Sequence, residues 1–186
     1  MKKFLVILTI LIAVPVVAVF WFRSQVADFK IASTQTNTQA DTILGMSSSF
    51  VDNYVTKILS EDDTIPELRS RGRNLRATRA RVREGLSLQE KVQLIHGIQS
   101  GIFALIASVP PEHPLFLSSA FVQLKEEMNW KGELREKMQE YNQSVLTWNN
   151  LIRSKSFALT ANLVGEQEQL PYLNVDGFAP EPDIRM

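Results

Sequence analysis

Apolar residues are concentrated at the start of the chain. Between Phe4 and Phe22 there are 19 consecutive uncharged residues, 17 of them apolar, and a short basic N-terminus, residues 1–3, precedes them. One helix needs ~17–25 apolar residues to cross the ~30 Å hydrocarbon core of a bilayer. A signal-peptide core is shorter, ~7–15 residues. The pattern therefore predicts a retained transmembrane helix over residues 4–22, with a cleaved signal peptide as the alternative.

Charges on the two sides of this run bear on its orientation. Lys2, Lys3 and the amino terminus outnumber Arg23 and Lys30 by one positive charge. Because basic flanks stay on the cytoplasmic side, the difference favours an extracytoplasmic domain. We expect a single-pass protein of the cell membrane.

Beyond the run, the pattern changes twice. Residues 23–40 are mostly polar, with three threonines near their end, and predict a juxtamembrane linker or a frayed helix end. Asp41 is a residue type that caps helix N-termini. From there apolar residues recur every three or four positions, which indicates one buried face of a helix. These residues are Ile43, Leu44, Phe50, Val51, Tyr54, Val55, Ile58 and Leu59.

Two further helix starts have recognisable capping residues. In Thr64-Ile65-Pro66-Glu67 a hydroxyl can cap, proline occupies the first turn, and glutamate follows three residues after the threonine. Ser87-Leu88-Gln89-Glu90 repeats the capping pair after Gly85, where we expect the chain to break or bend. Three prolines between residues 110 and 114 then predict a loop, because proline interrupts helices.

The longest apolar stripe follows this loop. From Leu115 to Arg153 no proline occurs, which predicts one helix of 39 residues, ~58 Å long. No segment shows the alternation of a strand. The predicted fold is therefore all-α: an N-terminal transmembrane helix followed by an elongated antiparallel bundle of long helices over residues 41–164. Its last part, residues 157–164, is a short helix, and the acidic C-terminal tail, residues 165–186, is irregular.

Few side chains are suited to catalysis. The chain has no cysteine, and its two histidines, His96 and His113, lack the His-Glu-x-x-His spacing of zinc hydrolases. Glutamates between residues 126 and 140 alternate with lysine and arginine, which favours an ion-paired surface over a di-iron site. The eight glycines are dispersed and form no phosphate-binding loop. We expect no catalytic residue, metal or cofactor, and a protein that is not an enzyme.

Net charge is zero, but the charges are segregated. Residues 64–91 carry a net charge of +5, whereas residues 156–186 carry −4. Three interpretations compete: ion pairs with the glutamate-rich helix or the acidic tail, binding of anionic lipid, and binding of an acidic protein or nucleic acid. Nucleic acid is least favoured because aromatic residues are not interleaved here. Seven arginines within 15 residues dominate this region and are the candidate lipid- or partner-binding residues: Arg69, Arg71, Arg73, Arg76, Arg79, Arg81 and Arg83.

A ladder of aromatic and amide residues lies near the end of the longest predicted helix. Tyr141 and Trp148 occupy one heptad position, and Asn142 and Asn149 the next. Buried asparagines at such positions can fix helix register through hydrogen bonds. The ladder with Val145 and Ile152 resembles the signature of the LemA family, two Tyr-Asn pairs seven residues apart. Asp63–Leu68, Pro114–Met128 and Phe157–Leu173 are similar to further segments of that family.

The resemblance implies a bacterial membrane protein with an elongated helical bundle and without an established activity. A MamQ-like branch of the family is implicated in membrane remodelling, and other members accompany membrane proteases. The ladder is interpreted as packing. We expect a non-enzymatic scaffold or adaptor in a bacterial inner membrane that binds a membrane-protein partner, itself or anionic lipid. The alternatives are an accessory subunit of a membrane peptidase or stress-response system and an oligomeric membrane-shaping protein.

Overall fold

The computed structural model describes residues 2–61, 65–128, 132–154 and 168–175, with side chains of the first helix described from residue 13 onward. These residues form helices and connecting segments, without strands, so the all-α prediction is confirmed for them. In chain order the elements are α1 (Lys2–Phe50), the π-helix η1 (Val51–Val55), α2 (Thr56–Glu61), α3 (Pro66–Arg79), α4 (Leu88–Ala107), the 3₁₀-helix η2 (Pro114–Leu117), α5 (Ser119–Met128) and α6 (Glu133–Arg153).

The predicted transmembrane helix over residues 4–22 is wrong. Among the residues described, no helix combines the length and the apolar character needed to cross a membrane. Residues 4–22 are the beginning of α1, a single helix of 49 residues. The helix continues without interruption past Phe22 through the charged residues Arg23, Asp28 and Lys30.

Residues 23–40 are helical within α1 rather than a linker, and Asp41 lies inside the helix rather than at its N-cap. Phe29, Ala32, Thr36 and Ala40 are buried. Their spacing of three and four residues continues the stripe predicted from Ile43 onward. The buried threonine is compatible with this position because its hydroxyl donates to the carbonyl of Ala32 over 2.8 Å. The apolar face of α1 therefore begins about 14 residues earlier than the polar composition indicates.

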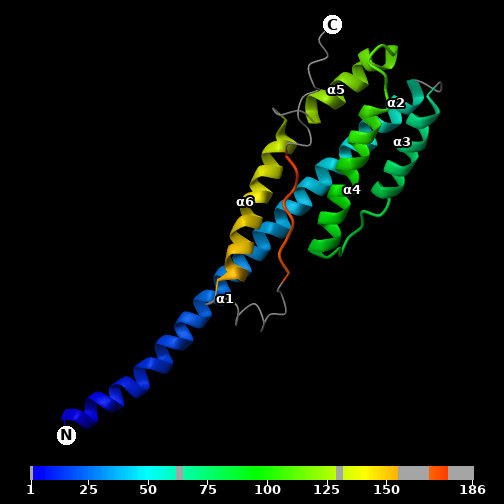
Figure 1. Cartoon of the computed structure of the whole chain (residues 1–186). Coiled ribbons are helices and arrows are strands. Elements are labelled where there is room, and N and C mark those ends of the chain that lie inside the picture. The colour runs from blue at the N-terminus through cyan, green and yellow to red at the C-terminus, as the bar shows by residue number, and fades with distance from the viewer. Residues whose placement is uncertain (1, 62–64, 129–131, 155–167, 176–186) are drawn as a thin grey trace.

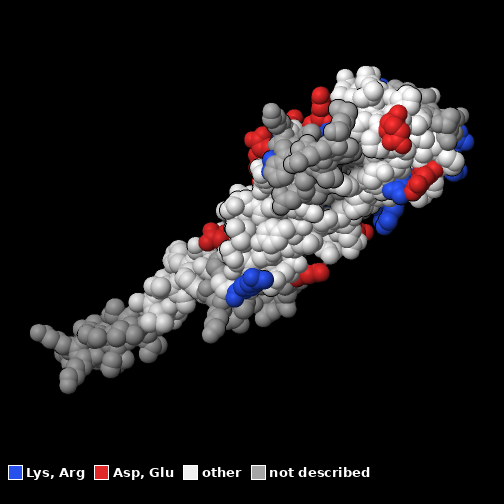
Figure 2. Space-filling view, turned by 45° about the horizontal axis from the view of Figure 1, so that its top comes forward, with Lys and Arg blue, Asp and Glu red and all other residues white. Residues whose placement is uncertain are grey.

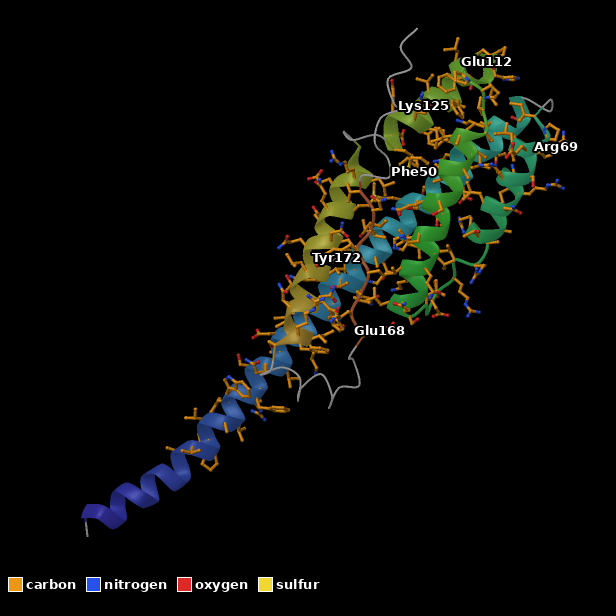
Figure 3. The ribbon with its side chains drawn as sticks, in the orientation of Figure 1. Phe50, Arg69, Glu112, Lys125, Glu168 and Tyr172 are labelled. Carbon is orange, nitrogen blue, oxygen red and sulfur yellow. The ribbon has the colours of Figure 1, made fainter. Side chains whose placement is uncertain are left out.

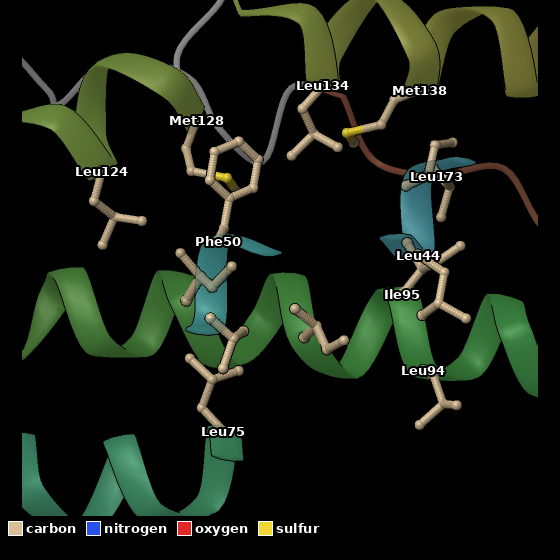
Figure 4. Packing of buried hydrophobic residues seen from close by; sticks show 14 of the residues in the cluster. Leu44, Phe50, Leu75, Leu94, Ile95, Leu124, Met128, Leu134, Met138 and Leu173 are labelled. Atoms are coloured by element: carbon tan, nitrogen blue, oxygen red, sulfur yellow. The ribbon is translucent and has the colours of Figure 1, made fainter. Parts of the chain in front are cut away.

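The helices surround the C-terminal half of α1 (Figure 1). The carbonyl of Ala104 in α4 accepts from Arg71 in α3 over 2.6 Å, as expected where α3 and α4 form an antiparallel pair. α6 packs along α1, with the rings of Phe29 and Trp148 4.8 Å apart. Figure 4 shows Phe50 of α1 close to Met128 of α5, and Leu44 close to Ile95 of α4 and to Leu173. One continuous core thus connects all of these helices.

The capping box at Ser87 is confirmed. The Ser87 hydroxyl accepts from the N–H of Glu90, and the Glu90 carboxylate accepts from the N–H of Ser87. Gly85, just before it, has φ = +75°, a conformation that favours glycine. The predicted cap at Thr64 lies outside the described residues, as does the short helix predicted over 157–164.

The single helix predicted over residues 115–153 is wrong. The chain forms η2, then α5, and α6 starts anew after Gly132, whose extended conformation (φ −79°, ψ 151°) ends helical continuity. Glycine has low helix propensity, so it is a favourable place for the break. The apolar stripe runs through both helices, which is why its periodicity did not reveal the interruption. Residues 168–175 are not helical.

Candidate functional site

The arginine-rich segment forms α3 and the turn after it. Leu68 and Leu75 are buried and Val82 is partly buried, at a spacing of seven residues that keeps apolar side chains on one side. Arg69, Arg73 and Arg76 follow one another at spacings of four and three residues and share one exposed side of α3. Figure 3 shows Arg69 on the outer side of this helix. Arg81 and Arg83 extend the basic surface beyond the end of α3.

Arg71 and Arg79 contact other residues of the bundle. Arg79 binds the carboxylate of Asp52 through two nitrogens, at 2.8 and 3.1 Å, and so ties α3 to the π-helix. Arg71 forms an ion pair with Glu67 one turn earlier and also donates to the Ala104 carbonyl. These partners are not on the glutamate-rich face of residues 126–140. The acidic tail beyond residue 175, the other partner considered, lies outside the described residues.

The remaining arginines face solvent. Arg73, Arg76 and Arg81 are exposed and have no ion pair among the described residues. Arg81 and Arg83 line a hollow of about 320 Å³ together with Leu86 and Glu90. In Figure 2, basic side chains gather along the edge of the molecule where α3 lies in Figure 1. We call Arg69, Arg73, Arg76, Arg81 and Arg83 the arginine face.

The aromatic and amide ladder on α6 lies elsewhere, along α1. Tyr141, Val145, Trp148 and Asn149 are buried, and Ile152 is partly buried against the core. These positions agree with the interpretation of the ladder as packing. The hydrogen bonds of the ladder, however, do not connect one helix to another. They are made to residues 168–175, an extended segment that we call the strap (Figure 3).

Each asparagine of the ladder binds one residue of the strap through both ends of its amide. The Nδ2 of Asn149 donates to the Leu170 carbonyl over 3.0 Å, and the Leu170 N–H donates to Oδ1 over 2.9 Å. Asn142 makes the same pair of bonds with Leu173, both 2.8 Å long. The amide side chains thus pair with the strap as a neighbouring β-strand would.

Contacts at the start of the strap continue this arrangement. The indole N–H of Trp148 donates to the Glu168 carbonyl over 3.1 Å. Arg153 donates to the side-chain oxygen of Gln169 over 2.9 Å. The leucine side chains of the strap are buried in the core, whereas Tyr172 is 49% exposed. The sequence identified the two asparagines as part of the ladder but did not indicate the strap. Residues 168–175 show no helical or strand periodicity of apolar residues.

Buried polar contacts elsewhere connect helices. The ammonium group of Lys91 in α4 lies 2.7 Å from the Asn37 side-chain oxygen and 2.8 Å from the Asp41 carboxylate, both in α1. The phenol of Tyr54 donates to Glu127 of α5 over 2.5 Å. This hydrogen bond, with burial and the nearby negative charge, raises the pKa of Tyr54 to about 12. Sequence patterns did not reveal these pairs, because their members are 50 or more residues apart.

Neither histidine is part of a reactive cluster in the described residues. Burial lowers the pKa of half-buried His96, which lines a hollow of about 570 Å³ beside Ser100, Phe103 and Asn174. The lining includes no carboxylate. Nδ1 of His113 accepts from the N–H of Leu115 and caps η2. The part of the chain that the structure describes has no group of three His, Cys, Asp or Glu side chains placed to hold a metal ion.

Comparison with known proteins adds no identification. The resemblance to the LemA family therefore stays a prediction drawn from the ladder and its neighbouring segments. No family model, no curated protein and no solved structure matches this chain.

Proposed function

We propose that this protein is a non-enzymatic helical scaffold that binds an acidic protein partner through the arginine face. One observation carries the proposal: Arg73, Arg76 and Arg81 are exposed without an ion pair in the described part of the chain, although acidic residues are as numerous as basic ones overall. Two neighbouring arginines, Arg71 and Arg79, bind intramolecular carboxylates. Arg73, Arg76 and Arg81 therefore carry positive charge that no carboxylate of the described residues pairs with.

The residue type favours a protein partner. Every basic residue between positions 64 and 90 is arginine. Arginine is enriched in protein interfaces, whereas lysine is depleted. Its planar guanidinium can bind a carboxylate through two parallel hydrogen bonds. A surface that only attracted anionic lipid would use lysine as readily, because that attraction depends mainly on charge.

The arrangement of titratable groups is consistent with a binding role. Burial raises the pKa of Tyr141, and the hydrogen bond to Glu127 raises that of Tyr54, so both pKa values are shifted away from physiological pH. A general base or nucleophile instead needs a pKa near the working pH. His96 has no carboxylate in its hollow to orient it.

The experiment compares two full-length triple variants. Arg73→Gln, Arg76→Gln and Arg81→Gln remove three charges from the arginine face. Arg23→Gln, Lys30→Gln and Lys57→Gln remove three exposed charges from α1 and α2 and serve as the matched control. A photo-crosslinking residue replaces exposed Ala77 on α3 in each protein, and crosslinking is performed in living cells. Captured proteins are then identified, purified and titrated against each variant.

We expect one acidic protein to be captured by the parent and by the control variant but not by the arginine-face variant. Its affinity should fall as salt rises from 50 to 500 mM, because exposed charges are screened over ~10 Å at 0.1 M. Equal capture by both triple variants contradicts the proposal. Binding of the parent to anionic vesicles, with no captured protein, assigns the face to lipid and also contradicts it.

A further inference from the structure

The strap lies along α6 with Leu170 and Leu173 buried, and we call the surface that it covers the groove. Its backbone is held by the side chains of Asn142, Trp148 and Asn149 on α6. Side-chain amides that pair with main-chain amides recognise an extended peptide as a sheet edge does in β-augmentation. This recognition does not require the peptide to be covalently attached to the groove.

The spacing of the two asparagines defines which backbone fits. Asn142 and Asn149 are seven residues apart, about 10.5 Å along a helix at ~1.5 Å per residue. Leu170 and Leu173 are three residues apart, about 10 Å along an extended chain at ~3.3 Å per residue. The partners are crossed, with Asn142 on Leu173 and Asn149 on Leu170, so the peptide runs antiparallel to α6. A helical peptide would span only about 4.5 Å over the same three residues.

Two apolar positions give the groove sequence preference. Leu170 and Leu173 are 7% and 2% exposed, whereas Pro171 and Tyr172 between them face outward. The N–H groups that bind the asparagines belong to the two leucines, so a proline between them removes none of these hydrogen bonds. Proline also restricts the free peptide and lowers the entropic cost of binding. The preferred ligand is an extended peptide with leucines three residues apart.

An empty groove would be unfavourable. Asn149 is 6% exposed and Trp148 is 1% exposed, and their amide and indole groups are bonded to the strap. Without a peptide these groups would exchange their partners for water, and the apolar surface that Leu170 and Leu173 cover would become exposed, which is unfavourable. The groove is thus built to be occupied by an extended backbone.

We propose that this groove is a binding site for extended Leu-x-x-Leu peptides, and that the strap is its tethered ligand, replaceable by such a peptide from another chain. The site is distinct from the arginine face and does not depend on it. Tethering gives the strap an effective concentration on the order of millimolar, so an external peptide binds weakly until the strap is weakened.

The test uses the full-length chain and a labelled peptide with the strap sequence Glu-Gln-Leu-Pro-Tyr-Leu-Asn-Val. A released chain carries Leu170→Ser and Leu173→Ser, which weaken the strap and leave the groove intact. A second chain adds Asn142→Ala and Asn149→Ala. Fluorescence anisotropy measures peptide binding, a peptide with both leucines replaced by serine is the control, and circular dichroism verifies that each chain stays helical.

We expect saturable binding to the released chain, about 10–100-fold weaker binding when the asparagines are also removed, and no binding of the serine peptide. Arginine-face variants should bind the peptide unchanged. Absence of binding to a helical released chain overturns the proposal, and so does equal binding after removal of the asparagines.

Hydrogen exchange of the parent chain provides a measurement that does not depend on any variant. If the strap is replaceable, the amides of Leu170 and Leu173 exchange through a local opening that is more frequent than global unfolding. The innermost amides of α6 should exchange more slowly. Exchange of the two leucine amides only at the rate of global unfolding shows that the strap does not leave a folded bundle, and overturns the proposal.

Discussion

Lys91 of α4 and Asp41 of α1 form an ion pair that is asymmetric in its burial. Their charged atoms are 2.8 Å apart, and the side chain of Lys91 is 10% exposed whereas that of Asp41 is 56% exposed. Removing one partner therefore leaves two very different situations. The carboxylate can be solvated where it is, but among the described residues the ammonium would retain the neutral Asn37 amide oxygen and no counterion.

We predict that Asp41→Ala destabilises the bundle by about 1–3 kcal/mol, because it leaves a nearly buried charge without its counterion. Lys91→Met should cost less, since the lost ion pair is replaced by apolar packing and Asp41 becomes hydrated. Urea denaturation of both variants measures the free energies of unfolding. A larger loss for Lys91→Met than for Asp41→Ala would contradict this order.

The phenol of Tyr54 makes stability sensitive to alkaline pH. Its pKa is raised to about 12 by its hydrogen bond to Glu127, by burial and by the carboxylate charge, whereas an unfolded tyrosine titrates near ~10. The protonated phenol of Tyr54 stabilises the folded state fully below pH ~10, and this contribution is lost as pH rises through the folded-state pKa. We expect the unfolding free energy to fall between pH 10 and 12, and to fall less steeply in Tyr54→Phe. Identical slopes in the two proteins exclude Tyr54 as the cause.

Two glycines inside helices should respond oppositely to alanine. A Cβ at Gly101 of α4 would lie 2.8 Å from Cδ1 of Leu75, a fully buried residue of α3 with little freedom to move. We predict that Gly101→Ala costs about 1–3 kcal/mol through overpacking. Gly45 of α1 has no atom within 4 Å of such a Cβ, so Gly45→Ala should stabilise by about 0.5–1 kcal/mol. Thermal unfolding measures both changes, and a stabilising Gly101→Ala would disprove the close approach of α3 and α4.

Trp148 combines apolar and polar contacts that two substitutions can separate. Its ring packs against Phe29, and its N–H donates to the Glu168 carbonyl. We predict a loss of about 0.5–1.5 kcal/mol for Trp148→Phe, which removes the hydrogen bond and part of the ring. Trp148→Ala should cost about 3–5 kcal/mol by leaving a cavity between α1 and α6. Chemical denaturation provides both values, and similar losses for the two variants would show that the ring contact with Phe29 contributes little.

Features set by neighbouring residues were predictable from the sequence. The capping box at Ser87 and Glu90 involves positions three residues apart, and the buried stripe of Leu68 and Leu75 depends only on helix periodicity. The fold class follows from the same periodicity. The seven-residue spacing of Tyr141 and Trp148 also placed both residues on one side of α6, which is buried.

Features set by distant partners were not predictable. Thr36 and its polar neighbours indicated a linker, but α6 packs against this part of α1 and the helix satisfies the buried hydroxyl internally. The strap has no periodicity, since its conformation is determined by Asn142 and Asn149 rather than by local preference. The apolar run at the start of the chain predicted a transmembrane helix, whereas no helix among the described residues has the length and apolar character to cross a membrane.

α1 extends beyond the helices that pack around its C-terminal half (Figure 1). Its 49 residues extend about 74 Å at ~1.5 Å per residue, and buried contacts with the bundle begin at Phe29. Each residue inserted before Phe29 would lengthen the projecting part by ~1.5 Å and rotate everything before it by ~100°. Inserting seven residues therefore nearly restores the original orientation of the projecting part and lengthens it by ~10.5 Å. Inserting two residues instead rotates the projecting part to nearly the opposite side. Reach and direction can thus be varied independently of the bundle and of both binding surfaces.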